Sequence, residues 1–341
     1  FREAHFSRDA WFRGAQFSGL TWFSEARFSE EAQFREAHFS GHAWFSGARF
    51  SDYASFTEAH FCGDAGFHRA RFNGNAGFSE ARFCHAWFSE AQFSDEANFE
   101  KAQFCGDADF TAKGDGGEAD AFQRLSFQDA RFGGPVSFEN RRFRHAATFN
   151  SCVFEKAPSF HNCGLHQDTD FGGAEFRDTE SDGADRAYRT LKLAMENHRA
   201  RQEQQLFYAL EMESRMKARH TPFLFKFFAA LFLVTSNFGQ SVLLPLFWFG
   251  LAFTLFYTHY LDLLAALPGP AVDAPALALK LAVDPIIRPF GSQFAIGPDL
   301  LKGLPHESLW NLTLLNRLQS ILSYLFLTLG FLALRTRFKM G

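Results

Sequence analysis

Phenylalanine recurs along the first half of the chain at alternating intervals of five and six residues. The series begins at Phe1, Phe6, Phe12, Phe17 and Phe23 and keeps this rhythm to Phe83. An alanine stands two positions before nearly every phenylalanine, and two or three mostly polar residues separate one such pair from the next. An amphipathic helix would need apolar residues three and four apart, and a continuous strand would need them two apart throughout. The pattern therefore predicts one short strand step and one corner in every unit.

These units predict a coil with four sides. After a phase shift at Phe88 and an interruption between Phe110 and Phe122, the series continues to Phe176. If each unit forms one side, four sides close a turn of about 22 residues, and phenylalanine stacks on phenylalanine at the strand spacing of about 4.8 Å. We expect the extra residue of the six-residue units to bulge at two opposite corners. Stability must come from stacked neighbours, as in any solenoid.

The unit resembles that of the pentapeptide-repeat family, which has a small residue, a variable one, a central Leu or Phe, and two more variable ones. Residues 15–19, Ala-Gln-Phe-Ser-Gly, are a typical match. The resemblance covers residues 1–177 and implies a right-handed quadrilateral β-helix. Because Phe1 already stands in phase with the repeat, we expect the sequence to be a piece of a longer chain.

A helical pattern replaces the phenylalanine rhythm after a polar break at residues 178–183. From Asp185, a plausible N-cap, the apolar residues lie on one helical face. They are Tyr188, Leu191, Met195, Leu206 and Leu210. We expect residues 178–221 to form one amphipathic linker helix that caps the open end of the β-helix, because an uncapped end would expose strand edges.

Two uncharged runs in the last third of the chain are long enough to cross about 30 Å of hydrocarbon. They predict transmembrane helices at about residues 242–262 and 316–334 of a membrane domain that spans residues 222–341. The shorter apolar stretch 223–236 contains Lys226, which favours a helix in the membrane interface, with a third crossing as the alternative. The expected fold is a β solenoid followed by a capping helix and two or three transmembrane helices.

Basic residues flank the two predicted spans on one side. Arg215, Lys217 and Arg219 precede the first span, and Arg335 and Arg337 follow the second. By the positive-inside rule, both flanks and the β-helix lie in the cytoplasm.

Two short motifs accompany the predicted helices. They are Phe-Tyr-x-x-Glu at Phe207, Tyr208 and Glu211, and Gly-x-Ser-x-x-x-Pro at Gly239, Ser241 and Pro245. This arrangement is similar to that of membrane-attached pentapeptide-repeat proteins of bacteria, which implies the bacterial inner membrane as the location.

Charge is divided unevenly along the chain. Residues 1–180 contain 18 Lys and Arg against 27 Asp and Glu, whereas residues 181–341 contain 16 against 11. Nothing in this balance indicates a nucleic-acid partner. The five cysteines are too few for a disulfide scaffold, and a reducing compartment is the natural interpretation.

Three groups of polar residues could be considered as metal sites. They are the cysteines that follow a phenylalanine (Cys62, Cys84, Cys105), the trio His161, Cys163 and His166, and the acidic residues Asp107, Asp109, Asp115, Glu118 and Asp120. The cysteines and histidines do not match a zinc spacing, and the acids do not match the calcium loop of twelve residues. We therefore predict no metal, cofactor or catalytic site.

Two further groups should form stripes on the solenoid surface. Arg27, Arg49 and Arg71 would make a basic stripe, and Trp22 and Trp44 would stack one strand apart on the opposite side. Exposed aromatic residues on such a face mark a partner site, and simple packing between neighbouring strands is the alternative.

The architecture suggests a function, because the sequence contains no phosphate loop, nucleophile elbow or zinc signature. We expect no enzyme but a scaffold that is anchored in the lipid bilayer and presents its walls to a protein partner, with homo-oligomer formation left open. One alternative is an ion channel or transporter with a re-entrant segment near residues 284–299, although its spans carry almost no polar residues and no Thr-Val-Gly-Tyr-Gly filter. The other is a DNA mimic that binds topoisomerases, as the resemblance implies for soluble members of the family.

Overall fold

The computed structural model describes residues 1–338 except 115–116, 118–119, 266–272 and 288–305. The chain forms two compact units, Phe1–His220 and Thr221–Gly341. The first unit contains a β-helix and two helices, and the described residues of the second unit form four helices.

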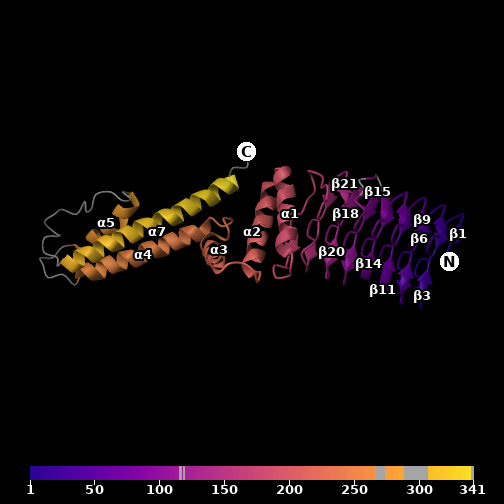
Figure 1. Ribbon diagram of the computed structural model, residues 1–341, viewed down its shortest axis with the longest axis horizontal. Helices are drawn as coiled ribbons and strands as arrows, with labels where there is room; N and C mark the ends of the chain where they lie inside the picture. The colour runs from indigo at the N-terminus through magenta and orange to yellow at the C-terminus, as the bar shows by residue number, and fades with distance from the viewer. Residues whose placement is uncertain (115–116, 118–119, 266–272, 288–305, 339–341) are drawn as a thin grey trace. The chain divides into compact units, whose positions relative to one another are not determined.

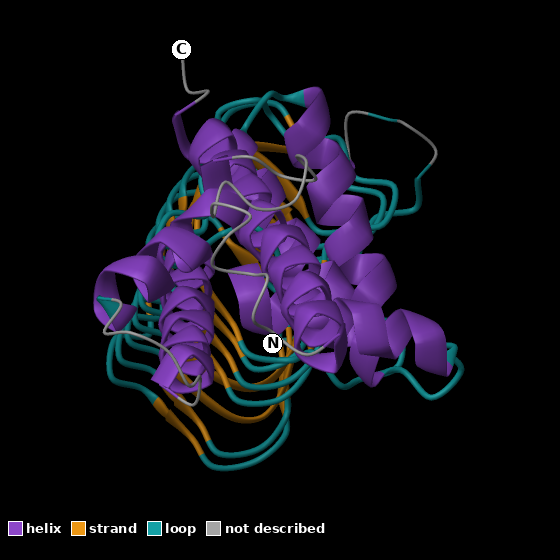
Figure 2. Cartoon of the chain, turned by 90° about the vertical axis from the view of Figure 1, so that its left-hand side faces the viewer, coloured by secondary structure: helices purple, strands orange, loops and turns teal. Residues whose placement is uncertain are grey.

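The β-helix has about eight coils and four walls, which confirms the predicted fold class (Figure 1). The described strand pairs are parallel, and phenylalanine lies beside phenylalanine, as Phe6 does beside Phe28. The rings fill the interior in four stacks, with 4.7 Å between the centroids of Phe6 and Phe28 and 5.0 Å between those of Phe23 and Phe45. In Figure 2 the strands of successive coils follow one another, with loops at the corners.

Two sheets of twelve strands form the walls, which we number in chain order. The first sheet forms walls 1 and 2. The strands of wall 1 are β1 (His5–Phe6), β5 (Arg27–Phe28), β9 (Arg49–Phe50), β12 (Arg71–Phe72), β15 (Gln92–Asn98), β18 (Ala121–Ser126) and β21 (Arg142–Phe143). The strands of wall 2 are β2 (Ala10–Trp11), β6 (Ala32–Gln33), β10 (Ala54–Ser55), β13 (Ala76–Gly77) and β22 (Ala147–Thr148). The second sheet forms walls 3 and 4. The strands of wall 3 are β3 (Gln16–Phe17), β7 (His38–Phe39), β11 (His60–Gly66), β14 (Arg82–Trp87), β16 (Gln103–Phe104), β19 (Arg131–Phe132), β23 (Val153–Phe154) and β24 (Glu175–Phe176). The strands of wall 4 are β4 (Thr21–Trp22), β8 (Ala43–Trp44), β17 (Ala108–Asp109) and β20 (Val136–Ser137). The longer strands β11, β14, β15 and β18 continue around a corner into the next wall.

Two kinds of corner alternate around each coil. In five-residue units the second residue after the phenylalanine adopts a left-handed conformation, as Glu25 does at φ 60° and Glu36 at φ 58°. The N–H of Ala26 then donates to Phe23 O at 3.0 Å and closes the turn. The six-residue units form the other two corners, which lie diagonally opposite, so the extra residues are placed as predicted.

The coil is interrupted between Phe110 and Phe122, and a buried arginine repairs the interruption. Arg141 occupies the position that alanine holds in most units, and it is fully buried. Its guanidinium donates to four backbone carbonyls at 2.5 to 3.3 Å, those of Phe88, Ala91, Phe110 and Thr111. One coil earlier, the carbonyl that corresponds to Ala91 O is Ala70 O, and it accepts from the backbone N–H of Gln92. The arginine therefore replaces backbone donors that the interruption removes, and burial lowers its pKa to about 10.

The segment 178–221, predicted as one helix, contains two. Helix α1 (Ala184–Asn197) ends at a break where Arg199 has φ 60°, and α2 (Arg201–Lys217) packs against α1. Both cover the last coil, as predicted for the cap: the Phe207 ring lies 5.1 Å from that of Phe176, and the buried Tyr188 hydroxyl donates to Asp178 O. The hydrophobic pattern is compatible with one long helix, and only the local backbone geometry divides it.

The predicted N-cap of this segment is wrong. Gly183, with φ 92°, precedes α1, and no side chain caps the helix. Asp185 lies in the first turn, where its carboxylate is 3.6 Å from Arg189. A left-handed residue at this position requires glycine rather than a side-chain cap.

The second unit contains α3 (Phe223–Ser236), α4 (Leu243–Ala265), α5 (Ala274–Ile287) and α7 (His306–Phe338). Two stretches are long and apolar enough to cross a membrane, Leu243–Ala265 and Leu314–Arg335, and they coincide with the predicted spans. Helix α3 coincides with the predicted interfacial segment, whereas α5 was not predicted. Figure 1 shows α4 and α7 side by side, with α5 packed against both.

Candidate functional site

The outer surface of each wall is set by the residue before each phenylalanine, because its side chain points away from the core. Along wall 1 these residues include Arg27, Arg49 and Arg71, which lie in register and are exposed. Among the described residues none of these three arginines has an ion pair, so they form the predicted basic stripe. In the first coils of wall 4, tryptophan takes the same position. Wall 4 adjoins wall 1, so the prediction that the tryptophans lie on the opposite side from the arginines is wrong: β4 and β5 are consecutive sides of one coil.

Wall 4 carries an aromatic surface that we call the tryptophan wall, formed by Trp22, Trp44, Gly66 and Trp87 with His42, Asp64 and His85 beside them. Trp22 lies beside Trp44, as predicted, with ring centroids 6.1 Å apart, and Trp22 is 46% exposed. Gly66 follows Trp44 in register, and a Cβ at Gly66 would lie 2.3 Å from the Trp44 ring. Only glycine therefore leaves space for this indole.

Each of two tryptophans has a histidine partner. The His42 and Trp44 rings are 5.9 Å apart, and the His85 and Trp87 rings are 6.4 Å apart and nearly parallel. Asp64 lies between the two histidines: its N–H donates to His42 Nδ1 at 3.0 Å, and its carboxylate is 3.4 Å from His85 Nδ1. These contacts fix the side chains that frame the wall. Trp87 and both histidines were not predicted as part of this surface, although His42 and His85, like Trp44 and Trp87, are two coils apart in the sequence.

The three cysteines of wall 3 stack beside one another on the outside of the coil, as predicted. Cys62 and Cys105 are exposed, and burial, together with the neighbouring thiols, raises the pKa of Cys84. Cys62 Sγ lies 3.7 Å from His38 Nε2. In the part of the chain that the structure describes, no three His, Cys, Asp or Glu side chains are grouped as ligands for one metal ion.

The other candidate residues are dispersed or buried. Cys163 donates to Phe138 O at 2.9 Å, and burial raises the pKa of its thiol to about 12, so it does not face His161 or His166 as a ligand. Asp107 is exposed, Asp109 half-buried and Asp120 buried, whereas Asp115 and Glu118 lie outside the described residues.

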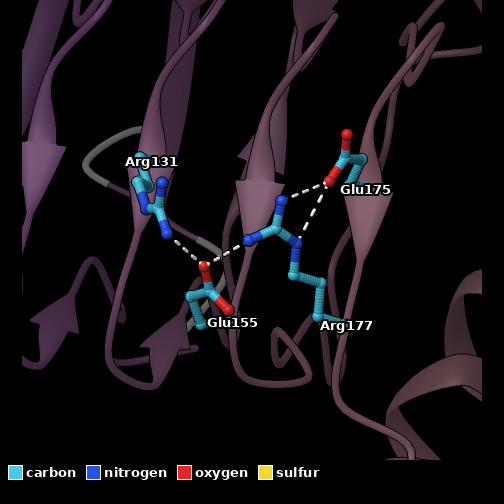
Figure 3. Close-up of polar contacts among 4 residues, drawn as sticks. All are labelled: Arg131, Glu155, Glu175 and Arg177. Atoms are coloured by element: carbon cyan, nitrogen blue, oxygen red, sulfur yellow. Dashed lines mark hydrogen bonds and ion pairs between the residues drawn. The ribbon is translucent and has the colours of Figure 1, made fainter.

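Charged residues on wall 3 form a network near the cap (Figure 3). Glu155 accepts from Arg131 at 2.5 Å and from Arg177 at 2.8 Å, and Arg177 also donates to Glu175 at 2.6 Å. Hydrogen bonding to Glu175, with the charge of Glu155, raises the pKa of Arg177. Because the four charges pair among themselves across three coils, this network stabilises the stack and leaves little unpaired charge for a ligand.

The Phe-Tyr-x-x-Glu motif has a structural role in the cap. Phe207 packs on the last coil, and Tyr208 lies under the Lys192 ammonium at 5.8 Å. The buried Glu211 carboxylate accepts from Arg189 at 3.0 Å and from Lys192 at 2.6 Å, both on α1. The motif therefore joins α1 to α2 and closes the β-helix.

A buried polar contact joins α5 to α7 in the second unit. Gln319 donates to Ala282 O at 2.6 Å and accepts from the Tyr260 hydroxyl at 3.0 Å. Ser320 and Tyr324 donate to Pro285 O and Ile286 O at 3.3 and 2.9 Å. Ser320 and Tyr324 thus supply donors to two of the last four carbonyls of α5, which a helix end leaves unpaired.

This contact corrects one argument from the sequence, which held that the spans carry almost no polar residues. Helix α7 buries Gln319, Ser320 and Ser323. These uncharged residues stand within the second apolar run, which was recognised by its lack of charge. Of the proposed re-entrant segment, residues 284–287 end α5, and residues 288–299 lie outside the described residues.

Comparison with known proteins bears on the first unit. Residues 1–49 match the family model described as pentapeptide repeats (9 copies). Searches of curated proteins and of solved structures found no match. Beyond residue 49, parallel register and ring stacking of the same kind continue to Phe176, which lies beside Phe154 with 5.0 Å between the ring centroids. The chain thus combines a match to the pentapeptide-repeat family at residues 1–49 with a β-solenoid that continues the same coil to Phe176.

Proposed function

We propose that the chain is a scaffold, anchored in the inner membrane of a bacterium, whose cytoplasmic β-helix binds a protein partner through the tryptophan wall. The interior of the β-helix is filled by phenylalanine rings, so its walls are the surfaces available to a partner. The exposed aromatic side chains of wall 4 are the observation that carries the proposal. Tryptophan is enriched among the residues that dominate binding energy at protein interfaces.

Burial supports the membrane anchor. The rest of the chain buries only 11% of the apolar window of α4 and 33% of that of α7. A core helix of a soluble protein would be mostly buried, so these surfaces need an apolar environment that the described residues do not supply. The basic residues on one side of the spans favour the cytoplasm for the β-helix.

Affinity purification from bacterial membranes tests this function. We expect the tagged chain, solubilised in detergent, to retain a protein partner, and the double variant Trp22→Ser/Trp44→Ser to lose it. Trp11→Ser is the matched control, because Trp11 is 67% exposed but lies on wall 2. Equal recovery of the partner with all three chains, or recovery of none under any growth condition, would contradict the proposal.

The second candidate is a channel or transporter, which the α5–α7 contact favours. In a span of Leu314–Arg335, Tyr324 lies near the middle, and the last described residues of α5 reach it. A helix that ends inside hydrocarbon needs internal donors for its last carbonyls, and Ser320 and Tyr324 would supply them. Recording from planar bilayers that contain the purified chain tests this candidate, and the absence of any ion current would dismiss it.

A further inference from the structure

A row of thiols on wall 3 has no part in the proposed function. Cys62, Cys84 and Cys105 each follow the phenylalanine of a wall 3 strand, and these phenylalanines lie in register in three successive coils. All three cysteines are free thiols; Cys62 and Cys105 are exposed, and Cys84 is half-buried. Three groups that bind soft metal ions therefore stand side by side on one outer face of the coil.

The backbone sets the distance between neighbours in this row. The ring centroids of Phe61 and Phe83, and those of Phe83 and Phe104, are 5.0 Å apart. Because the backbone fixes each Cβ atom, the Cβ atoms of neighbouring cysteines lie at about the strand spacing of 4.8 Å. A disulfide prefers Cβ atoms about 3.5 to 4.5 Å apart. The row is therefore spaced too widely for an ordinary disulfide.

One ion between two thiolates fits this spacing. A metal–thiolate bond in proteins is about 2.3 Å long, so two sulfur atoms on opposite sides of one ion are about 4.6 Å apart. Soft thiolate ligands select Cu(I), an ion that readily takes two ligands on opposite sides. The zinc spacings that the sequence lacks belong to sites with four ligands, and their absence does not bear on a site with two.

Neighbouring groups favour a cation at this position. A monovalent ion between two thiolates leaves a net negative charge. Arg82 is exposed and stands two residues before Cys84, so both side chains lie on the same outer face and the guanidinium can offset this charge. At one end of the row, His38 Nε2 lies 3.7 Å from Cys62 Sγ and adds a nitrogen donor.

We propose that Cys62, Cys84 and Cys105 form a surface site for Cu(I) or another monovalent ion that prefers sulfur, with Cys84 and one of its two neighbours on opposite sides of the ion. Cys84 is required because it adjoins both other thiols. Cys62 and Cys105 are two coils apart, roughly 10 Å, which is too far for one ion between them. Binding releases the two thiol protons to water. This site and the tryptophan wall are independent of each other.

Competition with a Cu(I) chelator tests the site on the full chain in detergent. Cu(I) is supplied without oxygen, with ascorbate as the reductant, and bathocuproine disulfonate reports the copper that the protein leaves free. We expect the wild type to retain one ion. Cys62→Ser and Cys105→Ser should each retain it as well, because either variant leaves one adjacent pair of thiols, whereas Cys84→Ser should lose it.

Two double variants separate adjacency from the number of thiols. Ser18 and Ser40 hold the position of the cysteines in the two preceding coils. Cys84→Ser/Ser40→Cys places a thiol beside Cys62 again and should restore binding. Cys84→Ser/Ser18→Cys keeps the same number of thiols but leaves no adjacent pair on wall 3, and it should not bind.

Urea midpoints equal to that of the wild type would show that the variants are folded, and Cys84→Ala replaces Cys84→Ser if serine lowers the midpoint. Three results would each overturn the inference. They are a wild type that retains no copper, a Cys84→Ser protein that binds like the wild type, and an equal partial loss for each single variant, which indicates adventitious binding by separate thiols.

Discussion

The buried arginine of the β-helix allows a prediction in which sequence pattern and structure disagree. Arg141 stands in a position where most units have alanine. The repeat pattern alone would therefore predict that Arg141→Ala stabilises the protein. The structure predicts the opposite, because the guanidinium donates to four carbonyls, and among the described residues two of them, those of Ala91 and Phe110, have no backbone donor.

The magnitude follows from the two carbonyls without a backbone donor, those of Ala91 and Phe110. A buried acceptor that loses its donor costs about 1 to 3 kcal/mol, so the gross loss is about 2 to 6 kcal/mol. This loss is reduced because burying the arginine charge already costs several kcal/mol. We expect Arg141→Ala to lower the free energy of unfolding by about 1 to 3 kcal/mol.

Urea denaturation of the detergent-solubilised chain measures this change. The free energy of unfolding of the Arg141→Lys protein should lie between those of the wild type and the Arg141→Ala protein. One ammonium group keeps the charge, but it cannot reach four acceptors that are arranged around a planar guanidinium. Ala70→Ser, at the corresponding position of an uninterrupted coil, tests how far any polar group is tolerated there. An Arg141→Ala protein with the midpoint of the wild type, or a higher one, would refute this account of the interruption.

Three further predictions concern the core, the cap and the second unit. Phe61→Ala should lower the free energy of unfolding by about 3 to 5 kcal/mol because it leaves a cavity in a ring stack, whereas Ser51→Ala on the exposed surface should change it by less than about 0.5 kcal/mol; equal urea midpoints would be inconsistent with the inward rings. Burial would raise the pKa of Asp178, but hydrogen bonds from Ser181 and neighbouring backbone N–H groups outweigh it and hold the pKa below its usual range. The carboxylate therefore stabilises the fold above its unfolded pKa of about 3.9, and this contribution is lost as the pH falls through the lower pKa of the folded state. In urea titrations between pH 5 and 2, the Asp178→Asn protein should lose less stability than the wild type. Equal losses of stability in the two proteins would count against this role of Asp178. Gln319→Leu should lower the melting temperature in detergent, because the buried Tyr260 hydroxyl loses its hydrogen-bond acceptor at a cost of about 1 to 3 kcal/mol, and an unchanged melting temperature would show that this contact contributes nothing.

The solenoid was predictable because each coil contacts only its neighbours. The rings of Phe6 and Phe28 meet because the two residues are one coil apart, and a local period in the sequence states that relation directly. The register of the arginine stripe and of Trp22 with Trp44 followed in the same way.

The sequence pattern did not predict features that depend on local backbone geometry or on contacts between distant residues. Helix α5 contains Pro285 and follows a proline-rich stretch, so its sequence indicates a loop, yet packing against α4 and α7 stabilises it as a helix. Gln319 and Ala282 are 37 residues apart, and no pattern in either segment announces the other. The partial site on wall 4 shows the same limit: the stacked tryptophans were predicted, but not the aspartate that lies between the two histidines.

The amino-acid sequence by itself determined the period of the coil, the inward direction of the phenylalanines and the positions of two apolar helices, because burying apolar side chains at a fixed spacing allows few alternatives. The tertiary structure decided which polar groups meet. It brought Arg141 to carbonyls of two other coils, joined α1 to α2 through Glu211, and gave α5 its donors from α7. Hydrogen bonds act only at short range and in defined directions, so their partners are known only when the backbone has been placed.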